Sequence, residues 1–333
     1  MESVPCNLCG SEAAHAVASQ TDIVHGSTNE LFKVVACKDC GLAYTNPRPD
    51  AETIGKYYIE SYSFHKSRTK ISLWIEKILS KMANSLFWAI LFNNIPKISR
   101  SLILRIRKKI DDPVYRFLKK KTTSAYSPKF LDIGCGSGLS AHYFGMKGSL
   151  KSYSKHYDVA GVETSESALK KLMQNIPAWK NLDEVPKDQF FDCIRMNWSL
   201  EHVHDPQKYF KFIYDHLRPG GMGVVCVPNM NGILYRLFPD CLELPVHLYH
   251  FRPEDLKAYI KLNNLELESI ETFSYPAMFL NSAECYPKLS SFRKMSLLEA
   301  FYFNRSLMRL SKNSDNGNDL IVTFKKSIPN KLN

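Results

Sequence analysis

The sequence predicts an α/β fold, in which a doubly wound, largely parallel sheet follows a small cysteine-containing module and a basic helical segment. Three observations support this prediction. From residue 129 onward short apolar runs alternate with helical stretches, a glycine-rich turn follows the first run, and two Cys-x-x-Cys pairs lie near the N-terminus. We therefore expect a metal-binding module over residues 1–48, a helical segment over 49–125 and an α/β core over 126–330.

The composition is typical of a globular protein from a reducing compartment. The chain has 333 residues and is 44% hydrophobic, which suits one core of about 200 residues with smaller appendages. It has no apolar run of about 18 residues that could span a membrane, and its first residues lack the pattern of a secretory signal. We expect a cytoplasmic protein in which the cysteines outside the two pairs are free thiols, namely Cys135, Cys193, Cys226, Cys241 and Cys285.

The two cysteine pairs predict a zinc site. Cys6-x-x-Cys9 and Cys37-x-x-Cys40 are each followed by glycine. Four thiolates arranged in this way close a tetrahedron about one zinc ion, and the glycine turns backbone amides toward the sulfurs. Because no coordination position stays open, such a zinc would be structural. Two disulfides or a redox-active pair are the alternatives, which a reducing compartment and the duplicated pattern disfavour.

The helical segment carries most of the positive charge. Apolar residues recur at helical spacing, and Pro96 and Pro113 divide the region into at least three pieces. Residues 66–121 contain fifteen lysines and arginines against three acidic residues, while the whole chain has a net charge of +11. Three interpretations stay open: a helical lid or dimer surface with solvated cations, an amphipathic surface facing anionic lipid, or a surface for nucleic acid.

The core begins with the strand Phe130–Ile133, which runs directly into a loop of three alternating glycines. Glycine lets the backbone approach a ligand closely. The loop reads GxGxG and is preceded by Asp132, whereas a dinucleotide-binding loop would read GxGxxG. Phosphate binding is therefore the weaker interpretation, and a tight turn without a ligand is the structural alternative.

The next strand, Val159–Val162, ends at Glu163. An acidic side chain at such a strand end can accept hydrogen bonds from both hydroxyls of a ribose. Taken alone, Glu163 could equally be a solvated or helix-capping carboxylate, but behind the glycine loop it becomes a cofactor candidate. Further strands are expected at Phe191–Arg195, Gly223–Val227, Leu265–Phe273 and Leu320–Phe324.

Residues 129–229 resemble the core of class I S-adenosylmethionine-dependent methyltransferases, in which LDIGCGSG is the usual first motif. The resemblance implies a Rossmann-like methyltransferase sheet and a site for S-adenosylmethionine. It implies that the glycine loop admits the amino-acid end of the cofactor, that Asp132 orders this loop and helps to hold the ammonium group, and that Glu163 binds the ribose. The loop residues assigned to the cofactor are Gly134, Cys135, Gly136 and Gly138.

Two further segments extend the resemblance to the rest of the cofactor pocket. Residues 191–206 are similar to the family's fourth strand and its lEHv-dp continuation, which places Asn197 and Trp198 beside the cofactor and the acceptor. The adenine pocket is assigned to Asn181 and Leu182, where relatives often have an acidic or small polar residue.

The acceptor side is predicted from the segment Leu244–Leu256, which resembles the family's HLyHFs-etL element. His247 and His250 are the candidates for acceptor binding or proton removal, and anchoring of the loop or of the following helix is the alternative. His202 is a third candidate. Related ubiquinone-pathway O-methyltransferases use a Glu-Glu-His cluster around this position for a divalent ion, but here Trp198 replaces the first carboxylate. We therefore favour a structural role for Glu201 and His202 at the start of a helix.

The run CKDCGLAYTNPRP, residues 37–49, resembles the zinc-ribbon segment that precedes many bacterial class I methyltransferases of uncharacterised or cell-surface-polysaccharide context. The expected function is methyl transfer to a small-molecule or saccharide acceptor, which would be lipid-linked if the basic segment contacts the inner membrane surface. Transfer from a sulfonium needs the acceptor held in line, and a hydroxyl acceptor also needs a base. A zinc-module RNA methyltransferase and a non-catalytic zinc scaffold are the alternatives.

Overall fold

The computed structural model describes residues 1–23, 26–58, 112–138, 149–237, 242–274 and 316–328. Most of the predicted basic helical segment, together with Cys241 and Cys285, lies outside these residues. No helix within the described ranges is both long and apolar enough to cross a membrane.

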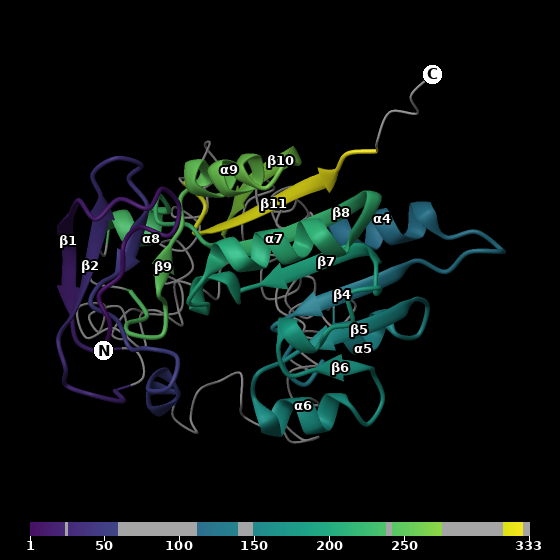
Figure 1. The fold of residues 1–333 in the computed structure, drawn as a ribbon, viewed down its shortest axis with the longest axis horizontal. Coiled ribbons are helices and arrows are strands. Elements are labelled where there is room, and N and C mark those ends of the chain that lie inside the picture. The colour runs from purple at the N-terminus through teal and green to yellow at the C-terminus, as the bar shows by residue number, and fades with distance from the viewer. Residues whose placement is uncertain (24–25, 59–111, 139–148, 238–241, 275–315, 329–333) are drawn as a thin grey trace, which may run out of the picture.

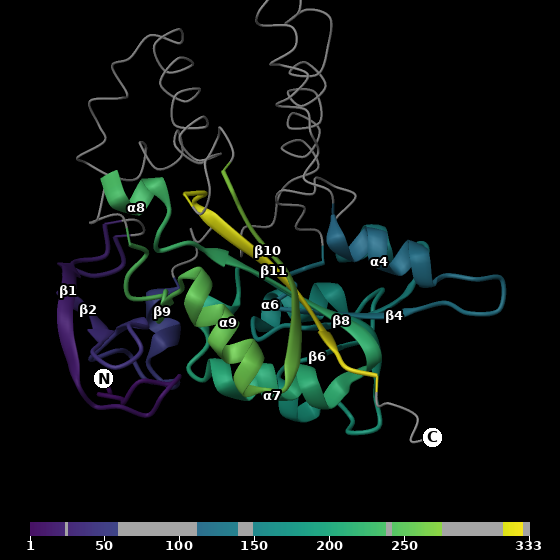
Figure 2. The same ribbon diagram turned by 90° about the horizontal axis from the view of Figure 1, so that it is seen from above.

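The N-terminal module forms a small antiparallel sheet with the strand order β1-β2-β3-β9. Strands β1 (Ala14–Gln20), β2 (Phe32–Cys37) and β3 (Ala43–Thr45) come from the module, and the 3₁₀ turn η1 (Ile54–Tyr57) follows them. The fourth strand, β9 (Tyr249–His250), comes from the predicted acceptor segment and pairs with β3. Figures 1 and 2 both show this sheet at one end of the molecule, beside the larger sheet.

The larger sheet has seven strands in the order β10-β11-β8-β7-β4-β5-β6. Strands β4 to β8 run parallel to one another, and β11 is antiparallel to both β8 and β10. The strand bounds are β4 Lys129–Ile133, β5 Asp158–Val162, β6 Ala178–Trp179, β7 Phe191–Asn197, β8 Leu217–Pro228, β10 Leu265–Phe273 and β11 Asp319–Lys326. The six predicted strands are confirmed, and the two-residue strand β6 is an addition that the sequence pattern did not indicate.

Helices cover both faces of this sheet. Successive residues of a strand point to opposite sides, so neighbouring positions belong to two different cores. On one face Leu131 and Ile194 share a core with residues of α7 (Pro206–His216) and α9 (Pro253–Leu262). On the other face Phe130 and Cys193 pack with residues of α4, α5 and α6. The bounds of the remaining helices are α4 Pro113–Lys121, α5 Leu150–Tyr153, α6 Glu166–Leu172, η3 Leu182–Glu184, η4 Leu200–His202 and α8 Ile233–Leu237. The predicted Rossmann-like fold is confirmed.

The N-terminal module is packed into the same core as the larger sheet. Cys6, Leu42 and Tyr44 belong to the apolar cluster that also contains Leu131 and Tyr259. The side chain of Asn7 accepts hydrogen bonds from Gln207 N at the start of α7 and from Tyr259 Oη of α9. The module is therefore anchored to helices α7 and α9 of the α/β core.

Candidate functional site

The glycine loop follows β4 in a conformation that only glycine adopts without strain. Gly134, Gly136 and Gly138 have φ values of +74°, +57° and +72°, which lie in the left-handed region. A Cβ atom on Gly134 would lie 2.5 Å from Cβ of Ser199. The loop therefore lies directly against the segment that follows β7, and no larger residue fits at Gly134.

Glu163 closes the other side of this loop. Its carboxylate accepts hydrogen bonds from Gly136 N at 2.7 Å and from Ser165 N at 2.8 Å. Because β4 and β5 are adjacent and parallel, the predicted ribose ligand and the glycine loop meet at the same edge of the sheet. The structure thus brings together the residues assigned to the amino-acid end and to the ribose of the cofactor.

Asp132 has a partner that the sequence analysis missed. Its two carboxylate oxygens accept hydrogen bonds from Arg195 Nε at 2.9 Å and from Arg195 Nη2 at 2.6 Å, and both side chains are buried. The guanidinium group also stacks over the rings of Phe130 and Tyr153. Burial opposes ionisation of Arg195, but the carboxylate of Asp132 raises its pKa. Asp132 is therefore fixed beneath the loop by a bidentate ion pair.

The carboxyl end of β7 presents polar groups toward this edge. Asn197 Oδ1 is buried without a hydrogen-bond partner among the described residues. Trp198 has an unusual φ of +48°, and its indole Nε1 donates to Asp319 Oδ1 at 2.9 Å. The two residues assigned to adenine follow β6: Asn181 caps η3 through its side chain, and Leu182 is buried.

Glu201, His202 and His247 form a compact polar cluster next to this edge. One ligand atom from each lies within 4.8 Å of the others, and the two imidazole rings are 4.7 Å apart between centroids. Ser199, which packs on Gly134, begins the turn that carries Glu201 and His202, and Leu248 N donates to Glu201 O at 2.8 Å. The structure therefore brings two of the three candidate histidines together, beside the glycine loop.

The sequence analysis favoured a structural role at a helix start for Glu201 and His202. Both lie in the short 3₁₀ helix η4, with Glu201 in its first turn. Neither carboxylate oxygen of Glu201 has a hydrogen-bond partner within the described part of the chain, although the side chain is only 1% exposed. The cap of α7 is instead Asp205, whose side chain accepts from Lys208 N. Burial raises the pKa of Glu201 well above its usual value. A buried acid whose two oxygens lack hydrogen bonds among the described residues calls for a further partner, such as a water molecule, an ion or a ligand.

His202 is oriented by a backbone carbonyl. Its Nδ1 lies 2.9 Å from Val246 O, and because a carbonyl oxygen only accepts, the neutral ring carries its proton on Nδ1 and its lone pair on Nε2. Nε2 lies 3.9 Å from Glu201 Oε1, and Nε2 of His247 lies 3.8 Å from Glu243 Oε2. Such a cluster can accept a proton from a bound hydroxyl, and its nitrogen and oxygen atoms could also hold a divalent cation.

His250 is not part of this cluster. It lies in β9, and its Nε2 is 3.4 Å from Thr45 Oγ1 of the N-terminal module. Burial lowers the pKa of His250 to about 4, so the ring is neutral near pH 7. This contact lies within the four-stranded sheet, between β9 and β3.

The four cysteines of the two pairs converge in the module. Their sulfurs all lie within 4.8 Å of one another, and the distances Cys6 Sγ–Cys40 Sγ and Cys9 Sγ–Cys37 Sγ are both 3.5 Å. A disulfide bond would be about 2.05 Å long, whereas sulfurs around a tetrahedral zinc lie about 3.8 Å apart for Zn–S bonds of about 2.3 Å. The donor set therefore fits a closed zinc site and excludes the two-disulfide alternative for this conformation.

The surroundings of these thiols differ in a way that suits metal binding. Burial raises the pKa of Cys6 to about 11. At Cys37 burial has the same effect, but hydrogen bonds from the backbone of Cys40 and Asp39 outweigh it and lower the pKa to about 6. Burial also raises the pKa of Cys40. The thiolate of Cys37 thus forms readily, while ionisation of Cys6 and Cys40 needs a cation nearby.

Comparison with known proteins identifies the family of the chain. A profile of the family described as "Methyltransferase domain" matches residues 103–270, just over half of the 333-residue chain. The chain belongs to this methyltransferase family. The ubiquinone biosynthesis O-methyltransferase of Pseudomonas putida (strain W619) is 28% identical over 160 residues, which cover 44% of this chain and 68% of that relative. The enzyme of the same name from Rickettsia felis is 24% identical over 130 residues, which cover 36% of this chain and 51% of that relative.

Among solved structures, an S-adenosylmethionine-dependent methyltransferase from Mesorhizobium loti is 17% identical, with a TM-score of 0.41 and coverage of 64% of this chain and 97% of that one. The protein is an S-adenosylmethionine-dependent methyltransferase. Its own residues fit the cofactor: the loop backbone is open to close approach, and Asn197 Oδ1 is a buried acceptor without a partner in the described residues.

Proposed function

We propose that this methyltransferase transfers a methyl group to a hydroxyl of a small-molecule or saccharide acceptor held against Glu201, His202 and His247. One observation carries the proposal: a buried carboxyl group, without hydrogen bonds among the described residues, lies beside two imidazole rings. The turn that carries it begins at Ser199, which faces Gly134 of the glycine loop. A buried polar group without a partner costs about 1–3 kcal/mol. A cluster of this kind is retained where a polar ligand completes it.

The cofactor would be held by residues from three strand ends. The glycine loop receives its amino-acid end, Asn197 Oδ1 accepts from its ammonium group, and Glu163 faces its ribose. When bound, S-adenosylmethionine supplies a methyl group on a positively charged sulfur. Asp132 contributes indirectly in this proposal, because its carboxylate is already paired with Arg195; it fixes the loop that receives the ammonium group.

His202 is the proposed base. Val246 O holds Nδ1–H, so Nε2 is the atom that accepts the acceptor's proton. Glu201 lies 3.9 Å from this nitrogen, and as a neutral acid it can donate a hydrogen bond to a second oxygen of the acceptor. A compound with neighbouring hydroxyls, as in a sugar or a diol, matches this pair of groups better than an amine or a carbon acid does.

The four-cysteine cluster is proposed to hold one zinc ion with a structural role. The sulfur geometry supports it, since four thiols converge without forming a disulfide. Contact of residues 66–121 with an anionic membrane surface, which would suit a lipid-linked acceptor, stays a separate proposal, and most of that segment lies outside the described residues. Sedimentation with anionic vesicles tests it, and binding that ignores lipid charge would refute it.

The proposal is tested by transfer of a tritiated methyl group to fractionated cell extract. We expect the label in a small, hydroxyl-containing compound or glycolipid, and label in RNase-sensitive material would show an RNA methyltransferase instead. His202→Gln and His247→Gln should lower the rate by about a hundredfold or more without weakening cofactor binding in calorimetry. The exposed His156 provides the matched control, since His156→Gln should have no effect.

Metal content shows whether Glu201, His202 and His247 act as a base or as ligands of a divalent cation. Zinc at the four cysteines alone gives one metal per chain, and a cation at Glu201, His202 and His247 would add a second one that these variants remove.

A further inference from the structure

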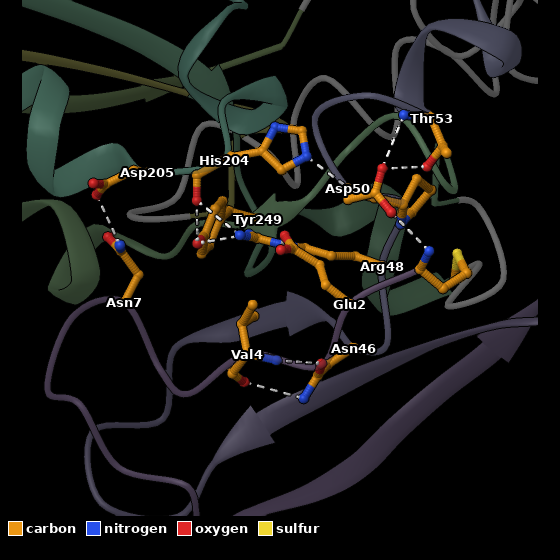
Figure 3. A network of polar contacts seen from close by, with 12 residues as sticks. Glu2, Val4, Asn7, Asn46, Arg48, Asp50, Thr53, His204, Asp205 and Tyr249 are labelled. Carbon is orange, nitrogen blue, oxygen red and sulfur yellow. Dashed lines mark hydrogen bonds and ion pairs between the residues drawn. The ribbon is translucent and has the colours of Figure 1, made fainter.

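Arg48, at the exit from the N-terminal module, is a buried arginine with contacts in three directions. The residue is only 5% exposed. Its Nε bonds Glu2 Oε1 at 2.7 Å, Nη1 donates to Tyr249 Oη at 2.9 Å, and Nη2 donates to His204 O at 3.0 Å. Figure 3 shows the guanidinium group between these partners. Such a fork cannot be reproduced by lysine, which carries a single ammonium group.

These contacts join two segments that are distant in sequence. Tyr249 Oη donates in turn to His204 O at 3.0 Å, so that Arg48, Tyr249 and His204 form a closed set of hydrogen bonds (Figure 3). The ring of His204 reaches back to Pro49 O at 3.0 Å. The chain around Arg48 therefore contacts both the turn after β7 and strand β9.

Both segments carry the groups assigned to the acceptor. His204 lies two residues after His202, and Tyr249 lies two residues after His247. A second module residue, Thr45, acts on the same segment: its amide donates to Leu248 O at 2.9 Å and its hydroxyl to His247 O at 2.8 Å. The module thus contacts both segments that carry the two imidazoles.

We propose that Arg48 is a positioning residue for acceptor methylation, and that the N-terminal module forms the fixed back wall of the acceptor site. The inference rests on the proposed function, because it concerns the same Glu201–His202–His247 cluster. It adds a task for the module besides metal binding. Within the described part of the chain no hydrogen bond or ion pair joins Arg48 to Gly134–Gly138 or to Glu163, so the effect should be confined to the acceptor side.

The test compares Arg48→Met and Arg48→Lys with Glu2→Gln. Glu2 is the partially exposed partner, and its replacement keeps the bonds from Arg48 to Tyr249 and His204. Hydrogen exchange, measured by mass spectrometry, should become faster by about tenfold or more at residues 201–205 and 246–250 in both Arg48 variants, which corresponds to the loss of a charge-assisted hydrogen bond. Exchange at residues 129–138 should stay unchanged, and Glu2→Gln should resemble the wild type.

Kinetics with an active extract fraction give the second measurement. Both Arg48 variants should lower kcat by about tenfold or more while the KM and calorimetric Kd for S-adenosylmethionine change by less than about twofold. Tyr249→Phe should give a smaller loss, and its effect should not add to that of Arg48→Met, because the two residues share one contact.

Unchanged exchange at 201–205 and 246–250 in the Arg48 variants would overturn the inference, as would a parallel loss of cofactor affinity. If Arg48→Met speeds exchange throughout the chain, Tyr249→Phe decides between a local and a global effect. This variant leaves the buried guanidinium of Arg48 paired with Glu2. If no extract fraction is methylated by the wild type, the proposed function fails, whereas the exchange experiment still decides the role of Arg48.

Discussion

Replacement of Arg195 by methionine tests how the loop that receives the cofactor is held. The side chain of Arg195 is 3% exposed and that of Asp132 is 7% exposed, so removal of the guanidinium leaves a buried carboxylate with no cation beside it. Breaking such a buried pair costs about 3–5 kcal/mol. Since a whole domain is stable by about 5–15 kcal/mol, Arg195→Met should lose a large share of the free energy of unfolding.

The assay is guanidinium chloride unfolding followed by far-UV circular dichroism, with calorimetry of S-adenosylmethionine on the same samples. The double variant Asp132→Asn with Arg195→Met removes both charges and should recover much of the lost stability, because no unpaired ion remains. A loss of less than about 1 kcal/mol of the free energy of unfolding in the single variant would refute the reasoning. It would mean that a group other than Arg195 balances the charge of Asp132.

Three further predictions concern the glycine loop, the four cysteines and the buried His250 in β9. Gly134→Ala should weaken S-adenosylmethionine binding by about tenfold or more in calorimetry, because φ is +74° and the added Cβ would meet Ser199 at 2.5 Å. Cys9→Ser should lower the zinc content from one ion per chain toward none by plasma mass spectrometry and should unfold the module. Burial lowers the pKa of His250 to about 4, so the folded chain resists the protonation that the unfolded chain takes up below pH 6.5. The wild type should therefore lose about 3 kcal/mol of its free energy of unfolding between pH 6.5 and pH 4. His250→Gln should not show this loss.

Each of these predictions has a matched control. Gly55 has no atom within 4 Å of an added Cβ and a normal φ, so Gly55→Ala should bind the cofactor normally. Cys226→Ala, in the sheet interior, should keep its zinc. His15 lies on the exposed face of β1, so His15→Gln should unfold as the wild type does. Full zinc in Cys9→Ser, or an acid sensitivity of His250→Gln equal to that of the wild type, would contradict the assignments.

The sequence predicted the elements of the larger sheet well, because each begins as an apolar run bounded by a turn. Strand β6 escaped because two residues, Ala178 and Trp179, are too short for any periodicity. Arg195 carried a usable indication that was not used: a charged residue inside the apolar strand FDCIRMN must have a buried partner of opposite charge.

The arrangement of the acceptor side could not be predicted from the pattern. His247 and His250 are three residues apart, yet one lies in the polar cluster and the other faces Thr45. This division depends on the pairing of β9 with β3, and strands of two and three residues more than 200 positions apart leave no periodic trace. The unpaired state of Glu201 likewise follows from three-dimensional packing alone, because Asp205 takes the capping role at α7.

The pairing of β9 with β3 also determines how the chain can be divided. A fragment starting after the module would uncover the backbone groups of Tyr249 and His250 and the apolar side chains of Leu248 and Phe251, which are buried in the intact chain. An open strand edge flanked by apolar groups invites pairing with other molecules. The transferase half should therefore aggregate when expressed alone, and swaps of the N-terminal region between related enzymes should succeed only when strand β9 is exchanged together with it.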